Sequence, residues 1–321
     1  MFYTREEAIG INSRSKVAFF SISKEQTLLL KGIAILMVIL GHMDYITWGG
    51  AGGVTIFLIL SGYGIHESTR KNGIQHYWKK RLLKVWLPYV IVTVFVLIGK
   101  QISDIKRIIF SLIGLDFGII ADKSMWYISY IMLWYLGYYI IALVLKKRND
   151  TTYNLLFIIF ISLLPVLFKC LEMIGVWPLS RGSTVYLFAF PLGIVLSSIG
   201  NVQLVKKLKL SIWSILLLVT TAYLYSVYTQ MYDRRMALAW GINVLSVVTL
   251  IKFSGLIKRI LLWLGTHSYQ MYLFEMILLD RYGWFDRFSS KFLADISIFF
   301  TVCIMSVVYK QIYDSLLTGI E

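Results

Sequence analysis

An apolar segment near the N-terminus carries two residues whose types and spacing could do chemistry. The stretch LLLKGIAILMVILGHMDYITW, residues 28–48, is long and apolar enough for a membrane helix, yet it contains Lys31 and His42. Eleven helical steps bring these residues to within about 20° of one face, about 16 Å apart along the axis. Because ionisable side chains are costly in hydrocarbon, they commonly mark functional sites there. The alternatives are that Lys31 snorkels to the headgroups and that His42 hydrogen-bonds a neighbouring helix.

Two further segments carry polar residues within apolar surroundings. In GGAGGVTIFLILSGYGIHES, residues 49–68, Ser61 and Gly62 interrupt an apolar run, which either opens space for a ligand or serves close helix packing. In YWKKRLLKVWLPY, residues 77–89, Arg81 and Lys84 share a helix face at a spacing of three. Such a basic cluster suits a diphosphate group, although it is also a common topology signal or lipid contact.

A carboxylate lies inside the late apolar segment LGTHSYQMYLFEMILL, residues 264–279. Glu275 is in this segment, with His267 eight residues earlier on roughly the same side. Carboxylates in lipid are rarely left unpaired, so a histidine–carboxylate pair across helices is expected, which is also a general-base arrangement. Asp44 is another polar candidate, but its spacing of two from His42 points it to a different face.

The composition indicates a membrane protein. Hydrophobic residues make up 58% of the 321 residues and charged residues 15%, against roughly 25% charged in soluble domains. We assign the net charge of +15 to cytoplasmic loops that face anionic lipid, and we expect no nucleic-acid partner. Cys170 and Cys303 lie in separate segments, so neither a disulfide framework nor a zinc site is expected.

The elements that must position these residues are helices. We predict an all-α, polytopic integral membrane protein with about ten transmembrane helices in one bundle. Residues 1–27 form a cytoplasmic N-terminal tail, 28–313 the transmembrane domain and 314–321 a short cytoplasmic C-terminal tail, with both termini inside because Lys and Arg gather in the segments so placed. The amphipathic segment 104–121 is expected to lie on the surface or fold back. The predicted spans are 28–48, 50–66, 82–99, 125–145, 153–168, 183–199, 210–228, 236–253, 259–280 and 291–313.

Four motifs in sequence resemble the membrane-bound acyltransferase 3 family, which acylates sugars of cell-surface glycans. They are KGIAILMVILGH, IFLILSGYGI, RLLKVWLPY and LGTHSYQMYLFE, and their order and spacing agree with the family over nearly the whole chain. Three positions depart from the family pattern. Lys31 stands where arginine is commoner, Lys84 replaces a second arginine, and Glu275 stands where the family often has histidine.

The resemblance implies a plasma-membrane O-acyltransferase without a metal. Its donor would be acyl-CoA, most often acetyl-CoA, and its acceptor a cell-surface glycan or a lipid-linked sugar. Lys31, Arg81 and Lys84 would bind the CoA phosphates, and His42 would act as general base or as a transient acyl carrier.

The remaining candidates have less specific roles. Glu275 could orient His42, contact a sugar hydroxyl or be structural, while Ser61, Trp126 and Asp44 are candidates for substrate binding. Trp126 would stack on a sugar ring, or else belong to an interfacial aromatic belt. The alternative function is a transporter or flippase of a glycan or small solute, for which an inverted repeat would be expected but is not evident. The sugar, the acyl chain and the oligomeric state stay open.

Overall fold

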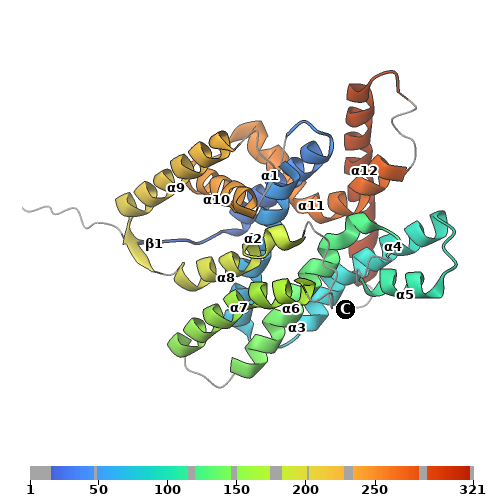
Figure 1. The fold of residues 1–321 in the computed structure, drawn as a ribbon. Helices are drawn as coiled ribbons and strands as arrows, with labels where there is room; N and C mark the ends of the chain where they lie inside the picture. The colour runs from blue at the N-terminus through green and yellow to red at the C-terminus, as the bar shows by residue number, and fades with distance from the viewer. Residues whose placement is uncertain are drawn as a thin grey trace, which may run out of the picture.

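The chain folds into a set of packed helices (Figure 1). The computed structural model describes residues 16–46, 49–114, 120–145, 150–173, 183–200, 202–227, 234–281 and 288–318. The longer elements are α1 (Lys24–His42), α2 (Gly49–Asn72), α4 (Leu87–Gly99), α6 (Trp126–Leu145), α7 (Asp150–Met173), α8 (Ala189–Ile199), α9 (Lys206–Ser226), α10 (Arg234–Leu250), α11 (Gly255–Arg281) and α12 (Lys291–Thr318). The shorter ones are α3 (Tyr77–Arg81), the π-turn η1 (Leu82–Trp86), α5 (Ile105–Ile113), and the 3₁₀ turns η2 (Lys123–Met125) and η3 (Ser183–Tyr186).

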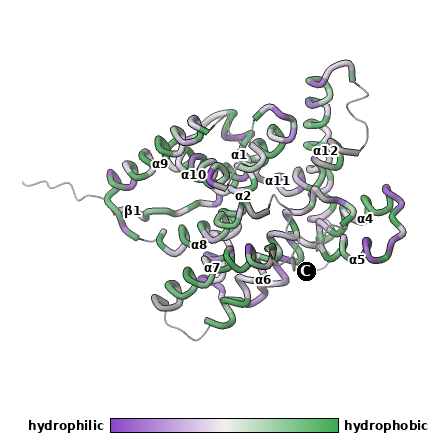
Figure 2. Tube along the Cα trace, viewed as in Figure 1, coloured by the Kyte–Doolittle hydropathy of each residue, from purple (hydrophilic) through white to green (hydrophobic). Residues whose placement is uncertain are grey.

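The all-α, membrane-like class is confirmed, while the number of spans stays a prediction. Each of the ten predicted spans contains a helix, and apolar residues cover most of the helices in Figure 2. Among the described residues, five helical stretches are long and apolar enough to cross a membrane: Lys24–His42, Tyr77–Gly99, Trp126–Leu145, Lys206–Ser226 and Lys291–Thr318. α2 and α11 are long as well, but they carry many polar and glycine residues. α8 covers only Ala189–Ile199 of the predicted span 183–199, about 16 Å of helix.

The amphipathic segment 104–121 forms a short helix. α5 begins after Asp104, whose carboxylate accepts a hydrogen bond from the Lys106 N–H at 2.9 Å, and it ends at Gly114 with φ of 75°. Nine residues of helix span about 14 Å, too little to cross a bilayer. Residues 115–119 of this segment lie outside the described residues.

A two-stranded antiparallel sheet near the N-terminus was not predicted. β1 (Lys16–Ala18) pairs with β2 (Gln203–Val205), which lies between α8 and α9. Strands of three residues leave too short a pattern to recognise in sequence. Part of the predicted tail 1–27 is therefore sheet, and α1 already begins at Lys24. α12 continues to Thr318, into the predicted tail 314–321, and residues 1–15 and 319–321 lie outside the described residues.

Glycines bring α1 and α11 into backbone contact. A Cβ atom added at Gly32 would lie 2.1 Å from the Leu261 carbonyl oxygen, and one at Gly265 would lie 1.9 Å from that of Leu28. No side chain fits at these distances, which is the small-residue packing typical of membrane helices. α2 is similarly close to α8, because a Cβ at Gly62 would lie 2.2 Å from the Phe190 carbonyl oxygen. Gly62 therefore serves helix packing.

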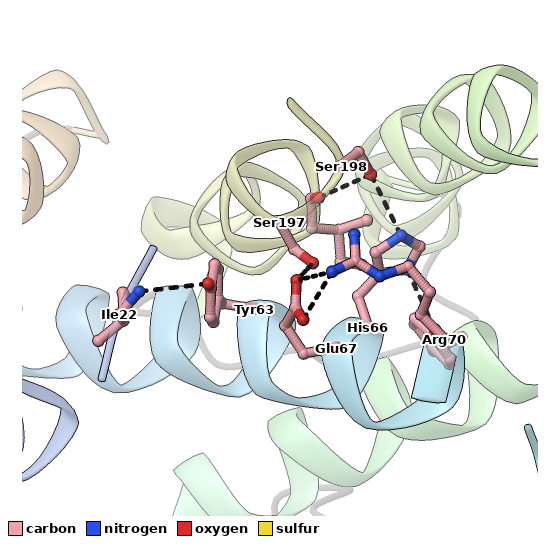
Figure 3. Close-up of polar contacts among 9 residues, drawn as sticks. Ile22, Tyr63, His66, Glu67, Arg70, Ser197 and Ser198 are labelled. Atoms are coloured by element: carbon pink, nitrogen blue, oxygen red, sulfur yellow. Dashed lines mark hydrogen bonds and ion pairs between the residues drawn. The ribbon is translucent and has the colours of Figure 1, made fainter. Parts of the chain in front are cut away.

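Polar contacts attach the C-terminal part of α2 to α8 and α6 (Figure 3). Glu67 forms a bidentate ion pair with Arg70, with both oxygens 2.8 Å from one guanidinium nitrogen, and accepts a hydrogen bond from the Ser197 hydroxyl at 2.8 Å. The buried His66 ring contacts the Ser198 hydroxyl at 3.1 Å and the Tyr138 hydroxyl at 3.2 Å. Since both ring nitrogens and the carboxylate are engaged, we assign this cluster a structural role.

The helical stretch Tyr77–Gly99 is interrupted by the π-turn and a proline. The Leu87 N–H donates to the Leu82 carbonyl, five residues back instead of four, and Pro88 has no N–H to donate. The carbonyls of Leu83 and Lys84 therefore lack the donor that lies four residues on in a regular α-helix. An unsatisfied carbonyl in an apolar environment is costly, so other donors are required.

Three tyrosines from α11 and α12 donate to carbonyls of this segment, including that of Leu83. The Tyr269 hydroxyl donates to the Val85 carbonyl at 2.5 Å, the Tyr309 hydroxyl to the Pro88 carbonyl at 2.9 Å, and the Tyr313 hydroxyl to the Leu83 carbonyl. These contacts fix the rotation of the π-turn, and with it the directions of Arg81 and Lys84.

Removing one of these hydroxyls should destabilise the protein. Tyr269→Phe and Tyr313→Phe each remove a hydrogen bond to a carbonyl of this segment, and Tyr313→Phe leaves the Leu83 carbonyl without a donor. The cost of about 1–3 kcal/mol should lower the thermal unfolding temperature in detergent by a few degrees. Tyr225→Phe is the matched control, because the Tyr225 side chain on α9 is 86% exposed. Equal unfolding temperatures for all three variants would contradict this role of the tyrosines.

Candidate active site

His42 and Glu275 form a close pair across α1 and α11. The Nδ1 atom of His42 lies 2.6 Å from Oε1 of Glu275, although 233 residues separate them in sequence. The Glu275 side chain is fully buried, whereas the His42 side chain is 38% exposed. An ionised carboxylate only accepts hydrogen bonds, so an ionised Glu275 would hold the imidazole in the form with the proton on Nδ1. Nε2 is then the basic nitrogen.

The basic nitrogen of His42 faces the first turn of α2. A Cβ atom added at Gly50 would lie 3.7 Å from Nε2, an ordinary van der Waals distance, so this glycine packs beside the imidazole. A Cβ at the preceding glycine of α1, Gly41, would lie 2.3 Å from the Gly50 backbone nitrogen. The two helices therefore approach each other closely at the imidazole.

A cavity of about 550 Å³ lies between α1, α2, the π-turn, α6 and α11. Its charged lining residues are Lys31, Lys80, Arg81 and Lys84. Two hydroxyl-bearing residues, Thr27 and Ser68, also line it. Its other lining residues are Val38, Val54, Phe57, Leu60, Ser61, Gly64, Ile65, Val85, Tyr127, Ile131, Tyr135, Ser268, Tyr269 and Tyr272. Within the part of the chain that the structure describes, the lining holds four basic residues and no acidic one, so the cavity favours a polyanion.

Aromatic rings hold Arg81 in place at this cavity. Its guanidinium carbon lies 4.8 Å from the centre of the Tyr77 ring and 5.7 Å from that of the Tyr135 ring. Cation–π contacts of this kind orient the guanidinium without neutralising it. Arg81 therefore keeps its charge available to an anionic ligand.

The cavity and the His42–Glu275 pair are adjacent along two helices, α1 and α11. On α1, the lining residue Val38 precedes His42 by four residues, and on α11 the lining residue Tyr272 precedes Glu275 by three. One helical turn, about 5 Å, therefore separates the pair from the cavity. The arrangement places four cations at one end of the cavity and an imidazole beyond the other.

Comparison with family models identifies the chain. A model described as an acyltransferase domain matches residues 29–310, which include both the cavity and the His42–Glu275 pair. The chain belongs to the acyltransferase 3 family. The resemblance carried by the four motifs is thus confirmed. Comparisons with curated proteins and with solved structures found no match.

The structure of this acyltransferase brings most of the sequence-predicted site residues together. Lys31, Arg81, Lys84 and Ser61 line one cavity, and the Tyr127 and Tyr135 hydroxyls lie within interaction range of the Ser61 hydroxyl. His42 and Glu275 form the pair one turn away. His267, the nearer histidine in sequence to Glu275, instead places its Nδ1 atom 2.9 Å from the Trp263 carbonyl oxygen.

Two predicted residues of the acyltransferase lie outside the cavity lining. Trp126 stacks on Tyr186, with ring centres 5.4 Å apart and planes at 19°. Asp44 adopts a positive φ of 63° just after α1, and its exposed carboxylate pairs with Lys291 at 3.4 Å. Whether either residue binds substrate stays a prediction.

The structure adds lining residues that the sequence prediction did not select. Lys80 joins the three predicted cations, and Tyr127, Tyr135, Tyr269 and Tyr272 form an aromatic wall. Spacings of eight between Tyr127 and Tyr135, and of three between Tyr269 and Tyr272, place each pair on one helix face. That periodicity was the available signal, but in a chain with 21 tyrosines it does not single out these four.

Proposed function

We propose that this membrane acyltransferase moves an acyl group, most simply acetyl, from acyl-CoA to a hydroxyl of a cell-surface or lipid-linked glycan. One observation carries the proposal: a cavity with four cations at one end lies one helical turn from a histidine that pairs with a buried carboxylate. A donor with a polyphosphate head and a reactive end on a long narrow arm has the matching shape and charge.

The cations would hold the donor's phosphates. With the N-terminus inside, as the loop charges favour, Lys31 and the π-turn lie toward the cytoplasm, where acyl-CoA is found. Arg81 offers a planar guanidinium for bidentate contact with a phosphate, and the lysines add point charges around it. The pantetheine arm would then extend along the cavity toward Val38.

The pair would catalyse the transfer. His42 Nε2 accepts the proton of the acceptor hydroxyl while the hydroxyl oxygen attacks the thioester carbonyl carbon. The tetrahedral intermediate then collapses, the carbon–sulfur bond breaks, and the departing CoA sulfur takes the proton from His42. Glu275 holds the imidazole through Nδ1 and stabilises its protonated form. In the alternative route, Nε2 itself attacks the thioester carbonyl carbon, the carbon–sulfur bond breaks and CoA leaves as its thiolate. The acceptor hydroxyl oxygen then attacks the acyl-imidazole, the carbon–nitrogen bond breaks, and the hydroxyl proton passes to the CoA thiolate.

The direct test uses the purified protein in detergent with radiolabelled acetyl-CoA and a panel of bacterial-type surface glycans and lipid-linked sugars. We expect label in the glycan as an ester that alkali removes. Absence of any ester, together with uptake of a labelled glycan or sugar by vesicles reconstituted with the protein, would favour the transporter alternative and overturn the proposal. A burst of acyl-protein before glycan labelling would select the acyl-imidazole route.

Cation removal should weaken donor binding. Lys31→Ala and Arg81→Ala each remove a charged contact worth about 1.5–3 kcal/mol, so the Kd of acetyl-CoA should rise about 10- to 100-fold by calorimetry. Lys79→Ala is the matched control, since Lys79 belongs to the same basic segment and is not among the lining residues. An unchanged Kd in both cavity variants would remove them from the donor site.

A further inference from the structure

Three cavity-lining side chains lie nearest His42, Gly50 and Glu275 along their helices, and we call them the collar: Val38, Val54 and Tyr272. They come from α1, α2 and α11, one from each helix. Val38 and Val54 are 1% and 9% exposed, and the Tyr272 hydroxyl is fixed by donating to the Ser124 carbonyl at 3.0 Å.

Each collar residue lies one turn from a residue around the catalytic imidazole. Val38 precedes His42 by four residues, Val54 follows Gly50 by four, and Tyr272 precedes Glu275 by three. His42, Gly50 and Glu275 are not among the cavity-lining residues, although they pack together in the next layer. The collar therefore stands between the cavity and the imidazole.

The collar has little room to adapt. Valine is branched at Cβ and strongly prefers one side-chain rotamer in a helix. Val38 also packs directly on α2, since a Cβ atom added at Gly53 would lie 2.7 Å from its Cγ2 atom. A group held among these side chains can therefore gain volume only by displacing them.

We propose that Val38 and Val54 set the largest acyl group that this enzyme transfers, and that they select a short acyl chain. The inference rests on the proposed function. The donor's phosphates are held at the far end of the cavity, so its acyl end is the part that must enter or pass the collar to reach His42. Each added methylene in such a pocket typically lowers kcat/KM by about 10- to 200-fold.

The test compares acetyl-, propionyl-, butyryl- and hexanoyl-CoA as donors for the native protein and for Val38→Ala and Val54→Ala. We expect the native protein to prefer acetyl-CoA. In each collar variant, the ratio of kcat/KM for butyryl-CoA to that for acetyl-CoA should rise at least about 10-fold. The Kd of CoA itself should not change, because the phosphate-binding cations are untouched.

A matched variant distinguishes a specific effect on acyl-chain selectivity from a general loss of packing in the protein. Val92→Ala makes the same truncation at a buried valine on α4 that is 1% exposed and does not line the cavity. Its donor profile should equal that of the native protein. The inference is overturned if both collar variants keep the native profile, if Val92→Ala broadens the profile equally, or if the native protein prefers long chains. No transfer from any acyl-CoA by the native protein would instead overturn the proposed function on which it rests.

Discussion

Replacing His42 by alanine is expected to lower glycan acylation by about 10²- to 10⁴-fold, the usual contribution of a general base. The reason is geometric: Glu275 occupies Nδ1 at 2.6 Å, and Nε2 faces the glycine-lined side of α2 one turn past the donor cavity. The measurement is ester formation from radiolabelled acetyl-CoA at saturating donor. The Kd of acetyl-CoA should stay near the native value, because His42 is not among the cavity-lining residues.

The buried carboxylate complicates the control for this variant. His42→Ala leaves the buried Glu275 carboxylate without this partner, which is destabilising. Because the His42 side chain is 38% exposed, the cost should be smaller than the roughly 3–5 kcal/mol typical of a fully buried pair. The double variant His42→Ala/Glu275→Gln removes that charge and should recover the protein level in the membrane without recovering activity. Native-like acylation by either variant would rule out His42 as the catalytic base.

The second large effect is expected for Glu275→Gln. The amide keeps the volume of the side chain but carries no charge to stabilise the protonated imidazole, and it can turn its NH₂ group toward Nδ1 and so favour the wrong tautomer. Loss of a carboxylate that orients a catalytic histidine lowers kcat by up to about 10⁴-fold in serine proteases, so we expect a fall on the order of 10²- to 10⁴-fold here. The fall should appear in kcat, with little change in the Kd of acetyl-CoA.

Glu67→Gln provides the matched control for that experiment. Glu67 is also a membrane-domain carboxylate with polar partners, Arg70 and Ser197, but it lies in the structural cluster of α2 and α8. The variant should lower the unfolding temperature and leave kcat nearly unchanged. If Glu67→Gln and Glu275→Gln reduce kcat equally, the effect of Glu275 is structural and the proposed orienting role is wrong.

Periodicity and hydropathy predicted the helices well, because each span repeats an apolar pattern over many residues. They could not predict the π-turn at Leu82–Trp86, because it depends on Pro88 and on hydrogen bonds from tyrosines of two helices distant in sequence. The β1–β2 pairing depends on contacts between residues almost 190 positions apart and leaves no local pattern. Local sequence thus predicts elements, and the deviations within them depend on tertiary partners.

In the candidate site, too, local sequence predicted the candidate residues but not the contacts between them. The spacing between Lys31 and His42 placed both on one face of α1, and the cluster around Arg81 indicated a phosphate site. The sequence predicted that Glu275 needed a partner but left its identity open, because the rotation of α11 against α1 is set by contacts at Gly32 and Gly265. Asp44 shows most clearly what the sequence could not predict. Its direction was inferred from helical geometry, but its φ is positive and its backbone leaves the helix.

The backbone contact between α1 and α11 also sets an angular tolerance for catalysis. The glycine contacts lie about twelve residues, or about 18 Å, from both members of the His42–Glu275 pair, so they act as a pivot. A change of only about 3° in the crossing angle would displace one partner by about 1 Å relative to the other, enough to break a 2.6 Å hydrogen bond. The distance between His42 and Glu275 therefore depends on the close helix approach that Gly32 and Gly265 allow about 18 Å away.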